Sequence, residues 1–225
     1  MNMTGKAAAI MLAATLLFGS GCAAFRSDIG NAYRGETRLN EGAEPVTVAF
    51  IFTHVRQTRG FDAVPKLDSR YRGFDDFFRD ALPEITNIGR YATFTERAED
   101  VNDPARRAER DSLAAASDYV IRMRFLRETS FAHQALGTIA STLSVTLLPV
   151  PYTRTYEVTA DVYDRAGRLV KRYERSAKVT QWVETFLIFV YPFHPETRKT
   201  EEVYVAFLHD IFREIEADRI LAASP

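Results

Sequence analysis

The stretch RTYEVTADVYDRAGRLVKRYERSAKVTQW, residues 154–182, alternates apolar and polar side chains on either side of the turn sequence DRAG. Alternation with a period of two predicts two half-buried antiparallel strands, and the glycine-containing turn completes a β-hairpin. Apolar residues occupy even positions on the first strand and odd positions on the second, so a loop with an even number of residues places them on one face. A loop over residues 164–167 meets this requirement and pairs Val162 with Leu169.

The segments before and after the hairpin provide the other strands and the helices. PVTVAFIF, residues 45–52, is apolar on both faces, as expected of a central strand that is covered on each side. DYVIRMRFLRE, residues 118–128, alternates as a half-exposed strand does. Helical spacing and capping residues predict three helices, over residues 73–85, 104–117 and 200–223. A short strand over residues 90–96 is expected between the first two helices.

These elements predict an α/β (α+β) fold in the order β-α-β-α-β-β-β-α. The sheet is mixed, the helices pack on it, and the C-terminal hairpin is antiparallel.

The first 21 residues have the features of an export signal. Lys6 precedes the apolar run AAAIMLAATLLF, which is followed by GSGC ending at Cys22. A short apolar run followed by small residues is typical of a secretory signal and is too short to span a bilayer comfortably. Cys22 is the only cysteine, so an intramolecular disulfide is excluded.

GSGCAA resembles the lipobox of bacterial lipoproteins, whose cysteine is lipidated and becomes the first residue of the mature chain. Gly19 departs from that pattern, which usually has an aliphatic residue three positions before the cysteine. The resemblance implies a lipid anchor at Cys22; the alternative is an ordinary cleaved signal with an incidental cysteine. Ala23 is not the aspartate of the family's inner-membrane sorting rule, which implies the inner leaflet of the outer membrane, facing the periplasm.

The chain therefore divides into three parts: a lipoprotein signal peptide over residues 1–21, a lipidated cysteine with a flexible tether over 22–44, and a single periplasmic α/β domain over 45–225. The tether is predicted because residues 23–44 are polar, contain scattered glycine and follow no period. A flexible chain of this length reaches roughly 25 Å.

Two segments without charge, 129–153 and 185–195, flank the hairpin, although charged residues make up 26% of the chain. Extending the predicted register places Pro149 opposite Trp182, so both segments leave the hairpin at the same end. Neither is long and apolar enough for a membrane-spanning helix. Three alternatives remain: an extra core layer, a patch in the bilayer interface, or a surface for an envelope protein or a second copy. The predicted contact residues are Leu143, Leu147, Leu148, Trp182, Phe186, Phe189, Tyr191 and Phe193.

The loop over residues 56–73 is the best candidate for a ligand site. It is rich in arginine and leaves the carboxyl end of the predicted central strand, where open α/β sheets tend to bind ligands. The alternative is an exposed crossover loop with solvated side chains. The candidate anion-binding residues are Arg56, Arg59, Arg70 and Arg72.

No recognisable catalytic motif is present in the mature chain. The four histidines are far apart, and HExxH, CxxC, GxSxG, GxGxxG and P-loop patterns are missing. We therefore expect no metal, no cofactor and no enzymatic activity. The formal net charge of −1 gives no reason to expect a nucleic-acid partner.

The strands VTVAFIF and SDYVIRMRF and the hairpin ending in Trp182, together with the lipobox-like start, resemble a broad group of periplasmic lipoproteins. The group shares the α/β fold of the TolB amino-terminal domain and includes LpoB-, PelC- and CsgG-type proteins. The resemblance covers roughly residues 45–222 and rests on the order of elements. It implies an envelope assembly or accessory factor, and some members form rings or pores.

We therefore expect a lipid-anchored, non-catalytic binding or assembly module that acts through its uncharged end. The alternative is a ligand-binding protein or enzyme that uses residues 56–73 for an anionic or glycan ligand.

Overall fold

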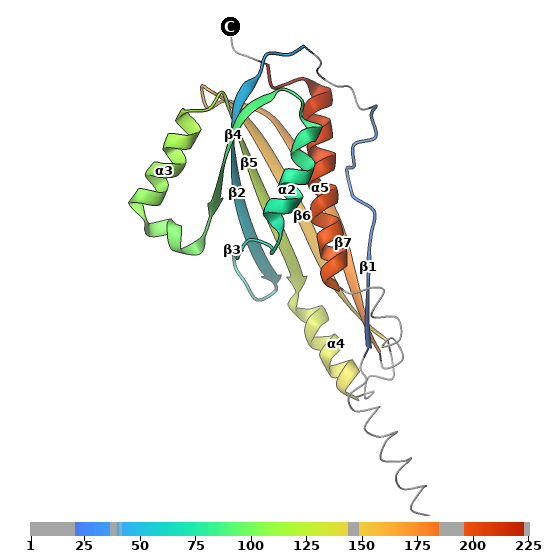
Figure 1. Cartoon of the computed structure of the whole chain (residues 1–225). Coiled ribbons are helices and arrows are strands. Elements are labelled where there is room, and N and C mark those ends of the chain that lie inside the picture. The colour runs from blue at the N-terminus through green and yellow to red at the C-terminus, as the bar shows by residue number, and fades with distance from the viewer. Residues whose placement is uncertain (1–20, 37–39, 41, 144–148, 185–195, 223–225) are drawn as a thin grey trace, which may run out of the picture.

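Seven strands form one mixed sheet (Figure 1). The computed structural model describes residues 21–36, 40, 42–143, 149–184 and 196–222. The strands are β1 (Gly21–Arg26), β2 (Val46–Arg59), β3 (Lys66–Leu67), β4 (Ile88–Glu96), β5 (Tyr119–Ser130), β6 (Val150–Asp164) and β7 (Leu169–Glu184). Their order is β1-β7-β6-β5-β2-β3, and β4 also pairs with β2. β2 is parallel to β4 and β5, whereas the other pairs are antiparallel.

The described helices are α2 (Phe74–Ala81), α3 (Pro104–Ala115), α4 (Phe131–Leu143) and α5 (Glu196–Asp218). α2 and α5 lie on one face of the sheet, and α4 continues from β5 at its lower end (Figure 1). The predicted α/β class, with a mixed sheet, helices packed on it and an antiparallel C-terminal hairpin, is confirmed. The predicted order of elements is incomplete, because β1, β3 and α4 were not expected.

The main core lies between the sheet and helices α2 and α5. Phe50 and Phe52 of β2 meet Phe74 and Phe78 of α2 edge to face, with ring centroids 4.9–5.2 Å apart. On the opposite face of β2, Ile51 belongs to a smaller cluster under α3. The prediction of a central strand covered on both sides is therefore confirmed.

The hairpin is present, but its predicted register is wrong by two residues. Val162 pairs with Lys171 instead of Leu169, and Trp182 pairs with Pro151 instead of Pro149. The cause is the turn: Gly167 takes a φ of +76°, and a β-bulge shifts the register between Val162 and Tyr163. A slip of two residues keeps every side chain on its predicted face.

The predicted tether is wrong for residues 22–36. We call residues 21–36 the N-terminal strap. Its first six residues are β1, which pairs with β7 along the sheet edge, and Ala23 is fully buried. Farther along, the Gly30 amide donates to the Ser176 carbonyl at 2.7 Å. The Tyr33 amide then donates to both carboxylate oxygens of Asp210 in α5, at 3.1 and 3.0 Å. Polar composition suggested a flexible chain, but backbone hydrogen bonds to an open sheet edge do not require apolar side chains.

Candidate functional site

α4 presents its larger apolar side chains to the outside. Leu136, Ile139 and Leu143 are 67%, 56% and 81% exposed, and their spacing of three and four residues places them on one side of the helix. The helix contains no charged residue. α4 therefore does not form the additional core layer that was one of the alternatives for residues 129–153.

The opposite side of α4 carries small side chains, and this side packs against the sheet. Gly137 is buried, and a Cβ atom built on it would come within 3.1 Å of the Val150 and Tyr152 side chains of β6. Glycine allows this close approach because it has no side chain. The local sequence therefore directs the small face of α4 inward and its aliphatic stripe outward.

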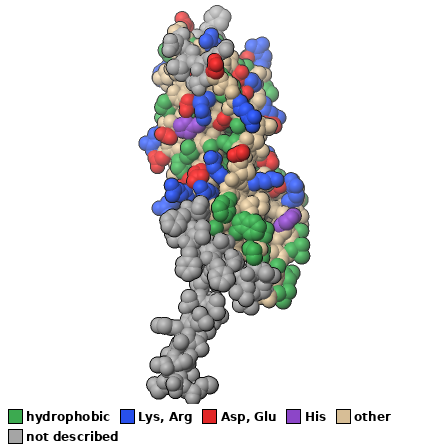
Figure 2. Space-filling model, turned by 90° about the vertical axis from the view of Figure 1, so that its right-hand side faces the viewer, with side chains coloured by type: hydrophobic (Ala, Val, Ile, Leu, Met, Phe, Trp, Pro, Cys, Tyr) green, Lys and Arg blue, Asp and Glu red, His purple; other side chains and the backbone are tan. Residues whose placement is uncertain are grey.

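The turn between β2 and β3 adds to this surface. Phe61 is 73% exposed, and its ring stacks on the ring of Phe131, the first residue of α4, with centroids 5.8 Å apart. We call the set Phe61, Phe131, Leu136, Ile139 and Leu143 the apolar end. Figure 2 shows hydrophobic side chains gathered at the lower part of the molecule, beneath a band of Lys and Arg side chains.

The start of β1 lies at this same end of the sheet. Cys22 pairs with Val183 of β7, and Val183 pairs with Val150, against which α4 packs. Neighbouring strands are about 4.8 Å apart, so the backbone of Cys22 is about 10 Å from that of Val150. The residue predicted to carry the lipid and the apolar end are therefore close in space.

The contact residues predicted from the sequence are only partly within the described residues. Leu143 is the most exposed residue of the apolar end, whereas Trp182 is half-buried and pairs with Ala23 and Pro151. Leu136 and Ile139 were not singled out, although their helical spacing with Leu143 could have found them. Six predicted residues lie outside the described residues: Leu147, Leu148, Phe186, Phe189, Tyr191 and Phe193.

The four arginines predicted to bind an anion do not form one site. β2 continues to Arg59, and β3 folds back on it, so the residues between 56 and 73 are divided between a hairpin and a loop. Arg59 pairs with Glu128 at 2.9 Å, while Arg56 lines a cavity of about 320 Å³ that also includes residues of β5, β6, α4 and α5. Arg70 and Arg72 line a second cavity of about 240 Å³, and the two cavities share Arg127.

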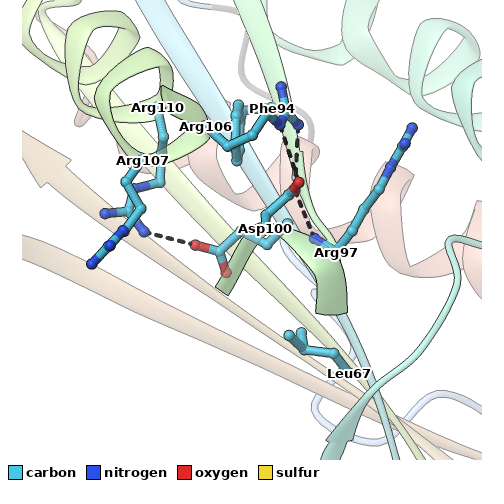
Figure 3. A pocket seen from close by; sticks show the side chains of 8 residues that line it. Leu67, Phe94, Arg97, Asp100, Arg106, Arg107 and Arg110 are labelled. Carbon is cyan, nitrogen blue, oxygen red and sulfur yellow. Dashed lines mark hydrogen bonds and ion pairs between the residues drawn. The ribbon is translucent and has the colours of Figure 1, made fainter. Parts of the chain in front are cut away.

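A third cavity, of about 220 Å³, is lined by four arginines and two carboxylates (Figure 3). It lies between the end of β4 and α3. Arg106 contacts Asp100 at 3.2 Å and lies over the Phe94 ring at 4.3 Å, and Arg110 contacts Glu96 at 3.1 Å. The hydrogen bond from Arg106 holds the pKa of Asp100 below its usual range. We interpret these contacts as structural ion pairs.

Two further observations concern the described part of the chain. No helix there has both the length and the apolar character needed to cross a bilayer. No group of three or more histidine, cysteine, aspartate and glutamate side chains there is arranged to hold a metal ion.

The chain is weakly similar to solved structures of PelC. The PelC dodecamer from Paraburkholderia phytofirmans is 12% identical, with coverage of 90% of this chain and 99% of that chain and a TM-score of 0.32. A point variant of that dodecamer in a second crystal form is also 12% identical, with coverage of 87% and 98% and a TM-score of 0.28. TM-scores this low do not establish a common fold. No protein-family model and no curated protein matches the sequence.

Proposed function

We propose that this chain is a lipid-anchored cell-envelope protein that is held through Cys22. Its apolar end lies against the bilayer, and the protein serves there as a non-catalytic binding or assembly module. The observation that carries this proposal is the orientation of α4, with its aliphatic stripe on the outside.

Exposed aliphatic side chains in such a stripe favour an apolar environment. Complete burial of one leucine or isoleucine side chain is worth about 1.5–3 kcal/mol, so Leu136, Ile139 and Leu143 together offer several kcal/mol to a surface that covers them. Phe61 and Phe131 at its edge suit the bilayer interface, where aromatic rings accumulate. The occupant we propose is therefore the lipid bilayer.

The N-terminal strap supports this choice. If Cys22 is acylated, the anchor begins at the sheet itself, because Cys22 and Ala23 already pair with β7. The acyl chains would then enter the membrane about 10 Å from the residues on which α4 packs. An anchor without slack holds the apolar end against the lipid surface and fixes the orientation of the domain.

Charge at this end is compatible with anionic lipid headgroups. Arg56 on β2 is paired in register with Arg127 on β5, just before α4 begins, and Arg56 has no carboxylate partner in the described part of the chain. A basic residue near an anionic surface contributes about 1 kcal/mol to membrane binding. Arg127 contributes less, because it already pairs with Asp68 at 2.8 Å.

The test uses Trp182, the only tryptophan, as a reporter at this end of the sheet. Full-length acylated protein is reconstituted into vesicles of phosphatidylethanolamine and phosphatidylglycerol that contain brominated lipid, and quenching of the Trp182 emission is measured. We expect strong quenching in the wild type and weaker quenching in the variant Leu136→Ser/Ile139→Ser/Leu143→Ser. Part of the quenching should remain, because the anchor at Cys22 still holds Ala23 and its partner Trp182 near the bilayer. The matched control is Leu169→Ser/Val170→Ser, which removes exposed apolar side chains at the opposite end of the hairpin and should leave quenching unchanged.

Equal quenching in the wild type and the triple variant would show that the apolar end does not face lipid. In that case light scattering identifies another occupant: a molecular mass that falls on triple substitution indicates a second copy, and an unchanged monomer indicates a different protein partner. The anchor is tested separately by Cys22→Ser, which should remove the mass of the acyl groups and lower the share of the protein in the membrane fraction.

A further inference from the structure

His54 is a buried polar side chain without a polar partner. It lies on β2 and is 3% exposed, and neither ring nitrogen makes a hydrogen bond with the described residues. The ring stacks on Phe125 and meets Phe74 edge-on, with centroids 5.0 and 4.9 Å away. Leaving a buried donor or acceptor unpaired costs stability, so such a group in a folded protein requires an explanation.

The charge state of His54 follows from its surroundings. Burial, followed by the charge of Arg70, lowers the pKa of His54 to about 4, while Asp68 acts in the opposite direction. The imidazole is therefore neutral at physiological pH and carries one N–H donor and one acceptor nitrogen.

His54 lines the cavity of about 240 Å³ introduced above, together with side chains from three other elements. Tyr204 of α5 is 7% exposed, and its hydroxyl makes no hydrogen bond with the described residues. Burial raises the pKa of Tyr204, so its hydroxyl stays protonated and can donate. The remaining walls include Asp68, Ser69, Arg70, Tyr71, Arg72 and Arg127.

Two of these arginines are held in place by carboxylates. Arg127 donates to Asp68 at 2.8 Å, and Arg70 donates to both oxygens of Asp75, at 2.6 and 2.7 Å. A guanidinium has five N–H donors, so each keeps donors for a further acceptor. Arg72 has no carboxylate partner in the described part of the chain, and the cavity therefore combines excess positive charge with unused donors.

We propose that this cavity binds a small oxyanion, the phosphate or carboxylate group of its ligand. Arg70, Arg72 and Arg127 supply charge-assisted hydrogen bonds, and the Tyr204 hydroxyl supplies a neutral donor. The His54 ring lines the site and responds to the charge that is bound there. The volume corresponds to about eight water molecules, which admits a phosphate or an acidic monosaccharide. This site differs from the four-arginine site predicted from the sequence, since Arg56 and Arg59 do not line it. It also does not depend on membrane contact by α4.

The experiment follows the imidazole signals of His54 by NMR in the full chain, kept in non-ionic detergent, during titration with inorganic phosphate. We expect saturable shifts, and we expect the pKa of His54 to rise above about 4 because a bound anion stabilises the imidazolium. Glucuronate tests the carboxylate form, and detergent micelles doped with phosphatidylglycerol test the lipid headgroup. Shifts with soluble anions alone, or with phosphatidylglycerol alone, identify the source of the oxyanion.

Variants separate binding from folding. Tyr204→Phe removes an unpaired hydroxyl but keeps the ring contacts with Tyr71 and Phe125, so the fold should be at least as stable while phosphate affinity falls about tenfold. Arg72→Gln should weaken affinity by a similar factor. The matched control is Arg107→Gln, which also removes one arginine but lies at the cavity of Figure 3. That cavity shares no lining residue with the proposed site, so the control should bind phosphate as the wild type does.

Three results would overturn the proposal. The first is the absence of a saturable shift of the His54 signals with every probe. The second is a shift of the same size with sodium chloride as with phosphate. The third is wild-type phosphate affinity in both Tyr204→Phe and Arg72→Gln.

Discussion

α5 and α4 carry the same kind of apolar stripe but use it in opposite ways. α5 directs Val203, Phe207 and Ile211 onto the sheet, and all three are buried. α4 directs Leu136 and Ile139 away from the sheet. The difference lies in the face opposite the stripe: in α5 that face is charged, whereas in α4 it contains glycine and other small residues that allow close contact with β6.

This comparison shows that helical spacing alone does not tell which face meets the core. A charged face fixes the orientation, because burial of unpaired charge is costly. A helix without charge leaves both orientations open, and close packing then decides. The absence of charge from α4 is thus as informative as its apolar spacing.

The largest expected effect is in α5. Phe207→Ala should lower the free energy of unfolding by about 3–5 kcal/mol, because Phe207 is 1% exposed and its removal leaves a cavity in the main core. Urea denaturation followed by circular dichroism measures the change. A loss below 1 kcal/mol would mean that α5 is not the core helix and that the two helices do not differ as described.

An intermediate effect concerns the polar side of α5. Arg175 of β7 is 3% exposed and pairs with both Asp210 and Glu214. Arg175→Met leaves Asp210 without its cation, whereas Glu214 keeps Lys171. We expect a loss of about 2–3 kcal/mol, reduced from the fully buried case because Glu214 is also partly hydrated.

The matched control for this change is Lys171→Met on the same strand. Lys171 pairs with Asp218 and Glu214, but its side chain is 38% exposed, so the loss should stay below about 1 kcal/mol. Equal losses in the two variants would show that burial does not decide the strength of these pairs.

The smallest effect should be in α4. Leu136→Ala removes an aliphatic side chain that is 67% exposed, and stability should change by less than about 0.5 kcal/mol in the same denaturation experiment. A loss comparable to that of Phe207→Ala would place Leu136 in a packed environment and remove the contrast between the helices.

Much of the fold could be predicted because its elements follow a clear period. β2, β5, the hairpin, α2, α3 and α5 all correspond to predicted segments, and the helices pack on the sheet as expected. The hairpin register was missed because a bulge next to the turn leaves no trace in the alternation of side chains. β1 was missed because a short edge strand rich in alanine and glycine has no period of its own.

The candidate sites were harder to predict, for different reasons. The uncharged segment 129–153 is unusual in the sequence. The orientation of the helix α4 within it, however, depends on the contact of Gly137 with Val150 on the next strand. The cavity beside His54 draws on β2, β5, α5 and a loop, so only Arg70 and Arg72 were found. Tyr204 looked like a core residue, and only the three-dimensional structure shows that its hydroxyl has no partner among the described residues.

The pairing of β1 with β7 also has a mechanical consequence. In a chain that begins at Cys22, five residue pairs join the two strands, and the chain enters β1 at the end of the sheet where Cys22 lies. A pull applied there along the strand axis loads the interstrand hydrogen bonds in shear, all together, instead of peeling them apart one by one. Tension at the N-terminus would therefore pass directly into the sheet, and the attachment should give way only at forces that disrupt β1 as a unit.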